Sequence, residues 1–552
     1  MNFTTEWLKP PPQIKGQDPL GVRAPCENIY SQLLPGITNV TDRADLYAFY
    51  PWLIWALEQH EGPLKKKPFF ETLRRAECLQ TLIGNWHTNH TEEASWRHGA
   101  GLVGRDKLTP ALASLEAGKS LKLSTYATQD EESGTRYFKN KLGGLGQYYL
   151  GPLRDLGIVE GDVKEIKYVT ERGGILARSF DRRVNRRLFF ETLEKDRISV
   201  EDLKALRQFC PCYLTKNDAK REALVDLFFN RANAFFVAAN DSRRESLFLI
   251  LDLTSQLEND NNPATSPRDL VDLFRACTYS AALPSGATWD TKTALKTNRE
   301  GWQKYVRNEL LSIAVQSFFW GGLRELFTQG IRLQTSETYA DWFTLTFDET
   351  VLRRDLNEQF GSALDKCKNG LLPLTGWIEE SHEVQLGWML NDIQNSFEPV
   401  DATANVVATA TNLLLTLAAR EESTQSAYVG FVPHLNYLRY YPINLDSFAE
   451  NCRTIWPSMS VRDVLASIAK EWGLNAHFRV ALRKLRYESR DTFKIKPTEQ
   501  GLEVIEAPPP GFSNPRLMQC IQILLDLGLL EFESGLLMVS NAGRDLLRGL
   551  GD

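Results

Sequence analysis

Two stretches decide the fold: LRDLGIVEGDVKEIKYVTERGGILARSF, residues 153–180, and LLDLGLLEFESGLLMVSNAGRDLL, residues 524–547. In each stretch a helical segment ends in Asp-Leu-Gly, and a polar interval, an apolar β-like run and a second helix follow. The two glycines, Gly157 and Gly528, suit the carboxyl end of a helix, where a positive φ is common. The repeat therefore predicts a helix, a β-hairpin and another helix at both places.

A hydroxyl side chain precedes the second helix of each stretch. Thr170 and Ser540 occupy this place, and either residue can cap the helix that follows it. The order of elements resembles the winged-helix family, specifically the end of its recognition helix and its wing. The resemblance covers residues 136–180 and 512–550, and it implies two winged-helix-like α+β units.

The rest of the chain reads as amphipathic helices, most continuously between about residues 187 and 425. We expect a mainly α, multidomain protein that contains the two winged-helix-like α+β units. The expected domains are an N-terminal helical domain with an extended arm (1–135), a winged-helix-like unit with a basic cluster (136–200), a helical domain (201–440), and an α+β region that ends in the second winged-helix-like unit (441–552).

Length and charge limit the classes of protein. The chain has 552 residues, which suffices for three to four domains at about 150 residues each. Its net charge is −6, so any nucleic-acid site must be a local basic surface. The amino terminus lacks a signal-peptide core, and the longest apolar stretches are shorter than the roughly 20 residues of a membrane span. The sequence predicts a cytoplasmic protein that does not enter the membrane.

Eight cysteines in this length are too few for a disulfide scaffold and suit reduced thiols in a cytoplasm. Only Cys210 and Cys212 are close, as C-P-C, and the absence of a C-x-x-C pair excludes a zinc ribbon. His87 and His90 form an H-x-x-H pair near His98, but no second ligand pair stands at a usual spacing. We therefore expect polar loop histidines, no metal and no cofactor.

The first candidate nucleic-acid surface falls on the expected wing and the helix after it. This stretch holds eight basic and three acidic residues, and arginines here can contact phosphates. The alternative is a solvated face that pairs with acidic neighbours. The basic residues of this wing cluster are Lys164, Lys167, Arg172, Arg178, Arg182, Arg183, Arg186 and Arg187.

A second basic row lies in HFRVALRKLRYESRDTFKIK, residues 477–496. Its arginines are spaced by four, three and four residues, which places them on one helix face, and Phe478, Leu482 and Leu485 form the adjacent apolar face. Such a row suits phosphate or an acidic partner, and the alternative is a surface helix with internal ion pairs. The arginines of this row are Arg479, Arg483, Arg486 and Arg490.

Catalytic motifs are weak. A relaxed P-loop match ends in Gly118-Lys119-Ser120, but a helix precedes it and a strand follows it, the reverse of the required order. The segment from Arg307 to Ser312 resembles the R-x4-H motif of HEPN ribonucleases, with serine in place of the histidine. Glu165 and Lys167 form an E-x-K without a visible partner carboxylate. We expect no catalytic residues.

Three further segments are similar to an uncharacterised bacterial family found in anti-phage defence gene neighbourhoods. They include LLPGITNVTDR and FYPW within residues 20–57, the segment 302–323, and RVALRKLR with TFKIKPTEQGLEV within residues 477–505. The resemblance implies a cytoplasmic bacterial protein beside a nuclease or an ATPase on another chain, and it implies no catalytic residue.

These observations favour a non-enzymatic DNA-binding or scaffold subunit of a defence or DNA-processing complex, with DNA and other protein subunits as partners. One alternative is a nuclease whose metal site is scattered along the sequence, since scattered carboxylates leave no local signature. Another is a scaffold that binds only proteins.

Overall fold

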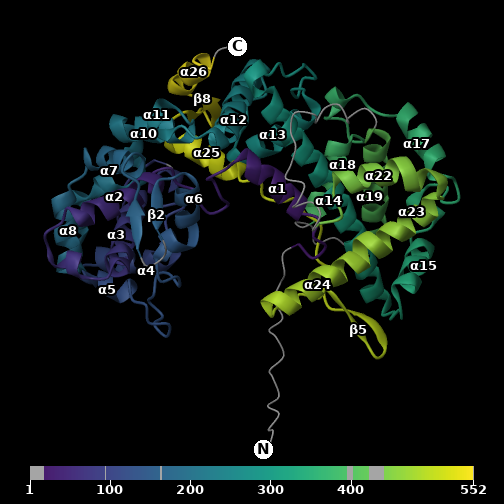
Figure 1. The fold of residues 1–552 in the computed structure, drawn as a ribbon, viewed down its shortest axis with the longest axis horizontal. Helices are drawn as coiled ribbons and strands as arrows, with labels where there is room; N and C mark the ends of the chain where they lie inside the picture. Colours follow the sequence, from purple (N-terminus) through teal and green to yellow (C-terminus); the bar gives the residue numbers. More distant parts are fainter. Residues whose placement is uncertain (1–17, 94, 162–164, 394–401, 422–440, 551–552) are drawn as a thin grey trace, which may run out of the picture. The chain divides into compact units, whose positions relative to one another are not determined.

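The computed structural model describes residues 18–550 apart from 94, 162–164, 394–401 and 422–440 (Figure 1). It is mainly helical, and its few strands pair as two-stranded antiparallel hairpins or ladders. No helix in the described ranges is both long enough and apolar enough to cross a bilayer. The mainly α class predicted from the sequence is confirmed.

The chain divides into two compact units, and neither is a continuous stretch of sequence. Unit 1 comprises residues 1–32, 274–290 and 296–515. Unit 2 comprises residues 33–273, 291–295 and 516–552. This grouping differs from the four consecutive domains expected from the sequence, because the last segment of the chain completes a unit that begins near the first.

Unit 1 is built around the long helix α14 (Lys296–Gln329), which packs against α18 (Glu383–Asp392) and α19 (Ala402–Ala419). Residues 305–323 of α14 are buried without a break. Most of them are apolar or small, and the buried Arg307 among them pairs with Glu421. The other named elements of unit 1 are α1 (Ala24–Leu33), α15 (Ser336–Thr346), α16 (Glu349–Leu352), α17 (Phe360–Asn369), α22 (Leu445–Glu450), α23 (Val461–Ser467), α24 (Asn475–Glu488), β5 (Ile495–Thr498) and β6 (Gly501–Val504). Helix α13 (Pro267–Ser280) is divided between the two units.

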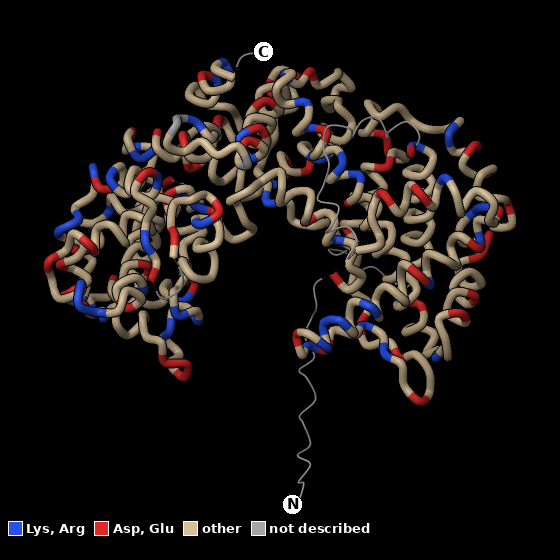
Figure 2. Tube along the Cα trace, in the orientation of Figure 1, with Lys and Arg blue, Asp and Glu red and all other residues tan. Residues whose placement is uncertain are grey.

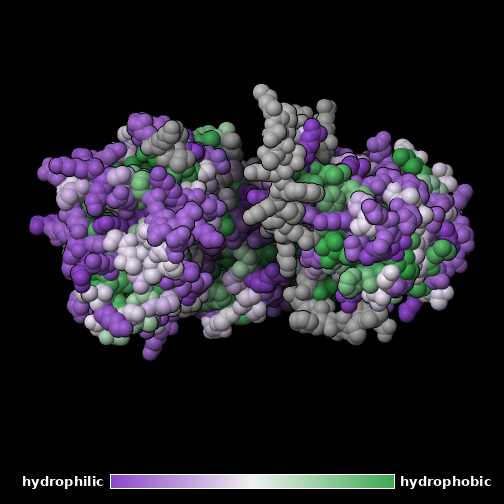
Figure 3. Space-filling view, turned by 90° about the horizontal axis from the view of Figure 1, so that it is seen from below, coloured by the Kyte–Doolittle hydropathy of each residue, from purple (hydrophilic) through white to green (hydrophobic). Residues whose placement is uncertain are grey.

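Unit 2 has an aromatic core in which Trp52 contacts the rings of Phe180, Phe189 and Phe209. Around it lie α2 (Leu46–Glu58), α3 (Phe69–Asn89), α4 (Arg105–Glu116), α5 (Leu123–Tyr126), α6 (Leu150–Asp155), α7 (Gly173–Asp181), α8 (Arg186–Lys195), α9 (Val200–Ala205), α10 (Asp218–Phe228), α11 (Ala232–Phe235), α12 (Asp241–Asn259), α25 (Leu517–Asp526) and α26 (Asn541–Arg548). Its strands are β1 (Leu121–Lys122), β2 (Val159–Gly161), β3 (Ile166–Tyr168), β4 (Arg197–Ile198), β7 (Leu530–Glu533) and β8 (Leu536–Val539). The surface that Figure 3 shows is mostly hydrophilic, with hydrophobic residues in small patches.

The sequence repeat is also a structural repeat within unit 2. Helices α6 and α25 are followed by Gly157 (φ +63°) and Gly528 (φ +64°), as the sequence predicts. The hairpin β2–β3 follows the first glycine and the hairpin β7–β8 follows the second. After each hairpin a backbone amide returns to the residue next to the glycine: the Val169 amide donates to the Ile158 carbonyl, and the Ser540 amide donates to that of Leu529. Both predicted helix–hairpin–helix segments are therefore present.

The two copies differ at the start of the last helix, which begins at Gly173 in the first copy and at Asn541 in the second. Ser540 accepts a hydrogen bond from the amide of Gly543 and caps α26, as predicted. Thr170 does not cap α7, whose preceding residue, Arg172, makes no side-chain cap. The backbone equivalent of Ser540 is Val169, which has no oxygen on its side chain, so the predicted cap at Thr170 was wrong.

Gly528 gives a direct test of the helix end. Alanine at this position must adopt a left-handed backbone, so Gly528→Ala should lower the free energy of unfolding of unit 2 by about 1 kcal/mol. Gly549→Ala is the control, because Gly549 also follows a helix but has a φ of −70° and should tolerate alanine. Chemical denaturation of both variants measures the difference, and equal stabilities would contradict the assignment.

Buried polar side chains join distant segments within each unit. In unit 2 the Arg43 guanidinium lies 2.9 Å from a carboxylate oxygen of Asp526, and it donates to the backbone carbonyls of Arg97, His98 and Ala100. Both charged side chains are almost fully buried. The pair therefore forms only when the segments around residues 43 and 526 have both packed into the interior of unit 2.

In unit 1 the imidazole of His477 is buried on α24. Its Nδ1 lies 3.1 Å from the Pro19 carbonyl, and its Nε2 accepts a hydrogen bond of 2.9 Å from the Lys494 amide. These two partners require the neutral tautomer with the proton on Nδ1.

Candidate functional site

The wing cluster of basic residues is spread over β3, α7 and α8 of unit 2. Lys164 lies outside the described residues. Arg172 is not available to a ligand, because its guanidinium donates to the carbonyls of Ala234 and Leu156. Lys167, Arg178, Arg182, Arg183 and Arg187 are exposed and Arg186 is half-buried.

Carboxylates stand beside most of the remaining members of the wing cluster. Lys167 pairs with Glu165 at 2.8 Å, and Arg183 lies 3.8 Å from Asp218. The other close pairs are Arg186 with Asp181 and Arg187 with Glu191. Exposed pairs of this kind are worth about 0–1 kcal/mol each, so phosphate can displace them, but they reduce the positive field of the cluster. The solvated-face alternative gains support here.

The second basic row lies on α24 of unit 1, and Figure 2 shows basic residues recurring along this helix. Arg479 and Arg486 are exposed and Arg483 is half-buried. The helix ends at Glu488, because Ser489 has a φ of +51°. Arg490 therefore lies beyond the helix, so the prediction of four arginines on one helix was wrong in this respect.

The apolar face expected beside this row is also narrower than predicted. Phe478 and Leu485 are half-buried, but Leu482 is 56% exposed. The buried contacts of α24 come from Ala476, His477, Val480 and Ala481. Leu482 therefore faces solvent among the arginines and does not anchor the helix.

Three arginines of the α24 row have aromatic or backbone neighbours and no acidic partner. Within the described ranges no carboxylate lies within 4 Å of Arg479, Arg483 or Arg486, whereas Arg490 pairs with Glu488 at 3.3 Å. The guanidinium of Arg483 lies over the ring of Tyr441, and that of Arg486 lies over the ring of Tyr487, which is 73% exposed. This surface keeps its positive charge, and we call Arg479, Arg483, Arg486 and Arg490 the α24 arginine row.

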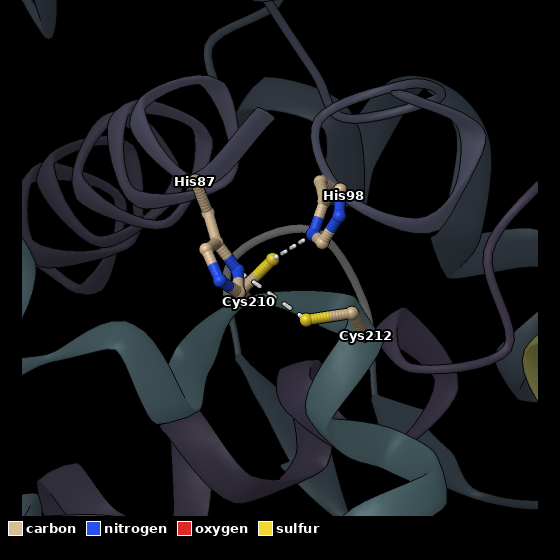
Figure 4. A group of neighbouring side chains, drawn as sticks. All are labelled: His87, His98, Cys210 and Cys212. Carbon is tan, nitrogen blue, oxygen red and sulfur yellow. Dashed lines mark hydrogen bonds between the residues drawn. The ribbon is translucent and has the colours of Figure 1, made fainter. Parts of the chain in front are cut away.

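Unit 2 also holds a cluster of metal-ligand side chains that the sequence did not reveal. His87 comes from the last turn of α3, His98 from the loop after it, and Cys210 and Cys212 from the start of a 3₁₀ segment at residues 211–216 (Figure 4). One ligand atom from each residue lies within 4.8 Å of all the others. His98, Cys210 and Cys212 are buried, and His87 is half-buried.

Hydrogen bonds already order the four side chains of this cluster. The Sγ of Cys210 lies 3.5 Å from Nδ1 of His98, and the Sγ of Cys212 lies 3.4 Å from Nδ1 of His87. A hydrogen bond from the Cys210 thiol lowers the pKa of Cys212 well below its ordinary value, whereas burial raises that of Cys210.

The histidines and the cysteines of this cluster each form a recognisable pair in the sequence. His87 and His98 stand near one another, and C-P-C is the only close cysteine pair, but the two segments are 112 residues apart at their closest hydrogen bond, between His98 and Cys210. The usual zinc templates search for C-x-x-C and fixed linkers, so they miss this arrangement. All eight cysteines lie in the described part of the chain and none forms a disulfide.

The weak catalytic motifs do not assemble into a site. Arg307 is buried and bonds to Glu421 and to the Leu417 carbonyl, so it stabilises the fold of unit 1. Glu165 and Lys167 pair with each other on the surface. The P-loop-like residues follow α4 and precede β1, the order that the sequence predicts and that cannot cradle phosphate.

No protein-family model, curated protein or solved structure matches the chain.

Proposed function

We propose that the chain is a non-enzymatic DNA-binding subunit, with a scaffolding role in a bacterial defence or DNA-processing complex. The observation that carries the proposal is the α24 arginine row. Three of its guanidinium groups lack a carboxylate partner among the described residues, although the chain as a whole carries a net charge of −6. A positive surface that an acidic protein leaves unneutralised suits a polyanion.

Side chains between the arginines strengthen the case for nucleic acid. Tyr487 and Leu482 are among the most exposed large side chains of the chain, and both stand on the face of α24 that carries the arginines. Arginine binds phosphate with two parallel hydrogen bonds, and an exposed ring can stack on an unpaired base. The row therefore combines side chains that can bind the phosphates of a nucleic acid with a ring on which a base can stack.

The two helix–hairpin–helix segments of unit 2 fit winged-helix-like units. The wing cluster would add phosphate contacts from the first of them, chiefly through Arg178 and Arg182, for which the structure shows no acidic partner among the described residues. The second segment contributes few basic residues, and we assign it a structural or protein-binding role.

The nuclease alternative receives less support. The one group of three or more potential metal ligands within the described ranges contains two histidines and two cysteines and no carboxylate. Nucleases that use Mg²⁺ need oxygen ligands, which this cluster lacks. The protein-only scaffold remains the second candidate, and DNA affinity separates it from the first.

Replacement of all four arginines of the α24 row by alanine should weaken binding to duplex DNA by tenfold or more at about 50 mM salt. The slope of log K against log salt should fall by about three to four units, since each phosphate contact contributes roughly 0.9. Fluorescence anisotropy with a labelled duplex at several salt concentrations measures both quantities. The fold should persist, because the buried face of α24 is unchanged.

A variant with the same change in charge serves as the comparison. Arg182, Arg183, Arg186 and Arg187 replaced together by alanine should reduce affinity less, because carboxylates already neutralise three of these side chains. A larger effect in this variant would move the interface to unit 2. If the wild-type chain shows no DNA affinity at about 50 mM salt, DNA binding is wrong and the protein-only scaffold takes its place.

A further inference from the structure

We propose that His87, His98, Cys210 and Cys212 bind one Zn²⁺ ion as a closed structural site in unit 2. The proposal is independent of DNA binding, because it depends on a different cluster in a different unit. The four residues supply two sulfur and two nitrogen ligands, a combination that structural zinc sites use. Ligand type favours zinc over magnesium or calcium, which prefer oxygen.

The distances between ligand atoms match a tetrahedron around zinc. Bonds of about 2.3 Å to sulfur and about 2.05 Å to nitrogen give sulfur–nitrogen edges of about 3.6 Å. The two observed sulfur–nitrogen contacts are 3.5 Å, between Cys210 and His98, and 3.4 Å, between Cys212 and His87. The remaining separations reach at most 4.8 Å, and rotations of the side chains would bring them to the other edges of this tetrahedron, about 3.8 Å between the sulfurs and about 3.3 Å between the nitrogens.

The surroundings of His98 suit a metal ligand better than a simple core histidine. Its Nδ1 faces the cysteine sulfurs, and its buried Nε2 has no described residue at hydrogen-bond distance. A carboxylate oxygen of Glu93 lies 3.7 Å from that Nε2. Metal-bound histidines commonly direct their second nitrogen to a carboxylate, and a slight approach of Glu93 would complete such a contact.

The backbone around the site is fixed before a metal binds. The buried Arg43 guanidinium donates to the carbonyl of His98 at 2.9 Å and to that of Ala100, and these bonds hold the loop that carries His98. Pro211 stands between the cysteines at the start of the 3₁₀ segment and restricts the turn that directs both sulfurs to one place. Metal binding would therefore cost little conformational entropy.

Zinc in this place would join three segments of unit 2: the end of α3, the loop after it, and the 3₁₀ segment at residues 211–216. Four protein ligands leave no coordination position for substrate, so the ion would stabilise the fold and would not catalyse a reaction. Since the cysteine and histidine segments are far apart in sequence, the ion would also close a long loop of the chain.

The test is the metal content of the purified full-length chain, measured by elemental analysis. We expect one zinc per chain in the wild type and none in the double variant Cys210→Ser, Cys212→Ser. Cys78→Ser is the matched control, because Cys78 is also buried in α3 but stands outside the cluster, and it should keep its zinc. Zinc-free wild type titrated with Co²⁺ should show tetrahedral cobalt bands and thiolate-to-cobalt charge transfer that saturate at one equivalent.

A second variant keeps the test decisive if the serine variant fails to fold. His98→Cys changes the ligand set to three cysteines and one histidine, which still suits zinc, so it should bind one Co²⁺ with stronger thiolate-to-cobalt charge transfer. The proposal is wrong if the wild type contains no zinc and gives no saturable cobalt spectrum. It is equally wrong if the spectrum is unchanged in both His98→Cys and the cysteine double variant.

Discussion

Replacement of Arg43 by methionine is expected to lower the free energy of unfolding of unit 2 by about 3–5 kcal/mol. The substitution keeps much of the side-chain volume but removes the partner of Asp526, leaving a carboxylate buried without its counter-charge. It also removes the donor of the His98 and Ala100 carbonyls. Hydrogen exchange detected by mass spectrometry measures the loss, because it reports the segments of unit 2 separately from those of unit 1.

Arg187→Met is the control for this prediction. Arg187 also pairs with a carboxylate, that of Glu191 at 2.7 Å, but its side chain is 90% exposed. Exposed pairs contribute about 0–1 kcal/mol, so this variant should resemble the wild type. If Arg43→Met is no less stable than Arg187→Met, burial does not make the Arg43–Asp526 pair important.

The second large effect concerns pH and His477 of unit 1. Burial lowers the pKa of His477 to about 4, from about 6.5 in an unfolded chain. Protonation would place a hydrogen on Nε2, which accepts the Lys494 amide. The unfolded state binds the proton more readily than the folded state. The contribution of His477 to the free energy of unfolding is therefore fully present above pH 6.5, and about 3 kcal/mol is lost as the pH decreases from 6.5 to 4.

His477→Gln isolates this contribution from the carboxylates that titrate nearby. The variant should be less stable than the wild type at pH 8, and the difference should narrow by about 2 kcal/mol at pH 5. Denaturation of both proteins across this range, followed in unit 1 by hydrogen exchange, provides the measurement. A difference that does not change with pH would show that the pKa of His477 is the same in the folded and unfolded states.

Local features of the fold could be predicted from the sequence. The positive φ angles of Gly157 and Gly528 and the hairpins after them follow from residue types that act within a few positions. The Thr170 cap failed for a local reason as well, since Val169 occupies the position that corresponds to Ser540 and Thr170 stands one position later. The division into two units could not be predicted, because no local pattern in residues 516–552 indicates that they pack with the segment that begins at residue 33.

The candidate sites divide in the same way. The spacing of Arg479, Arg483 and Arg486 predicted a shared helix face, and the three residues do lie on α24. Whether a basic side chain is already paired depends on the tertiary fold. The sequence therefore predicts that Arg172 contacts phosphate, whereas its guanidinium donates to backbone carbonyls. The zinc-ligand cluster depends on the juxtaposition of segments that a search for local motifs compares separately.

The discontinuous make-up of unit 2 has a consequence for biosynthesis. Arg43 and Asp526 are 483 positions apart, and at about 5–20 residues per second the ribosome makes the second roughly 25 to 100 seconds after the first. During that interval the nascent chain has a guanidinium without its counter-charge and the apolar surface that α25 will cover. A translation product that stops before Arg516 could not acquire the native interior of unit 2, and chaperones and proteases would recognise it as incomplete.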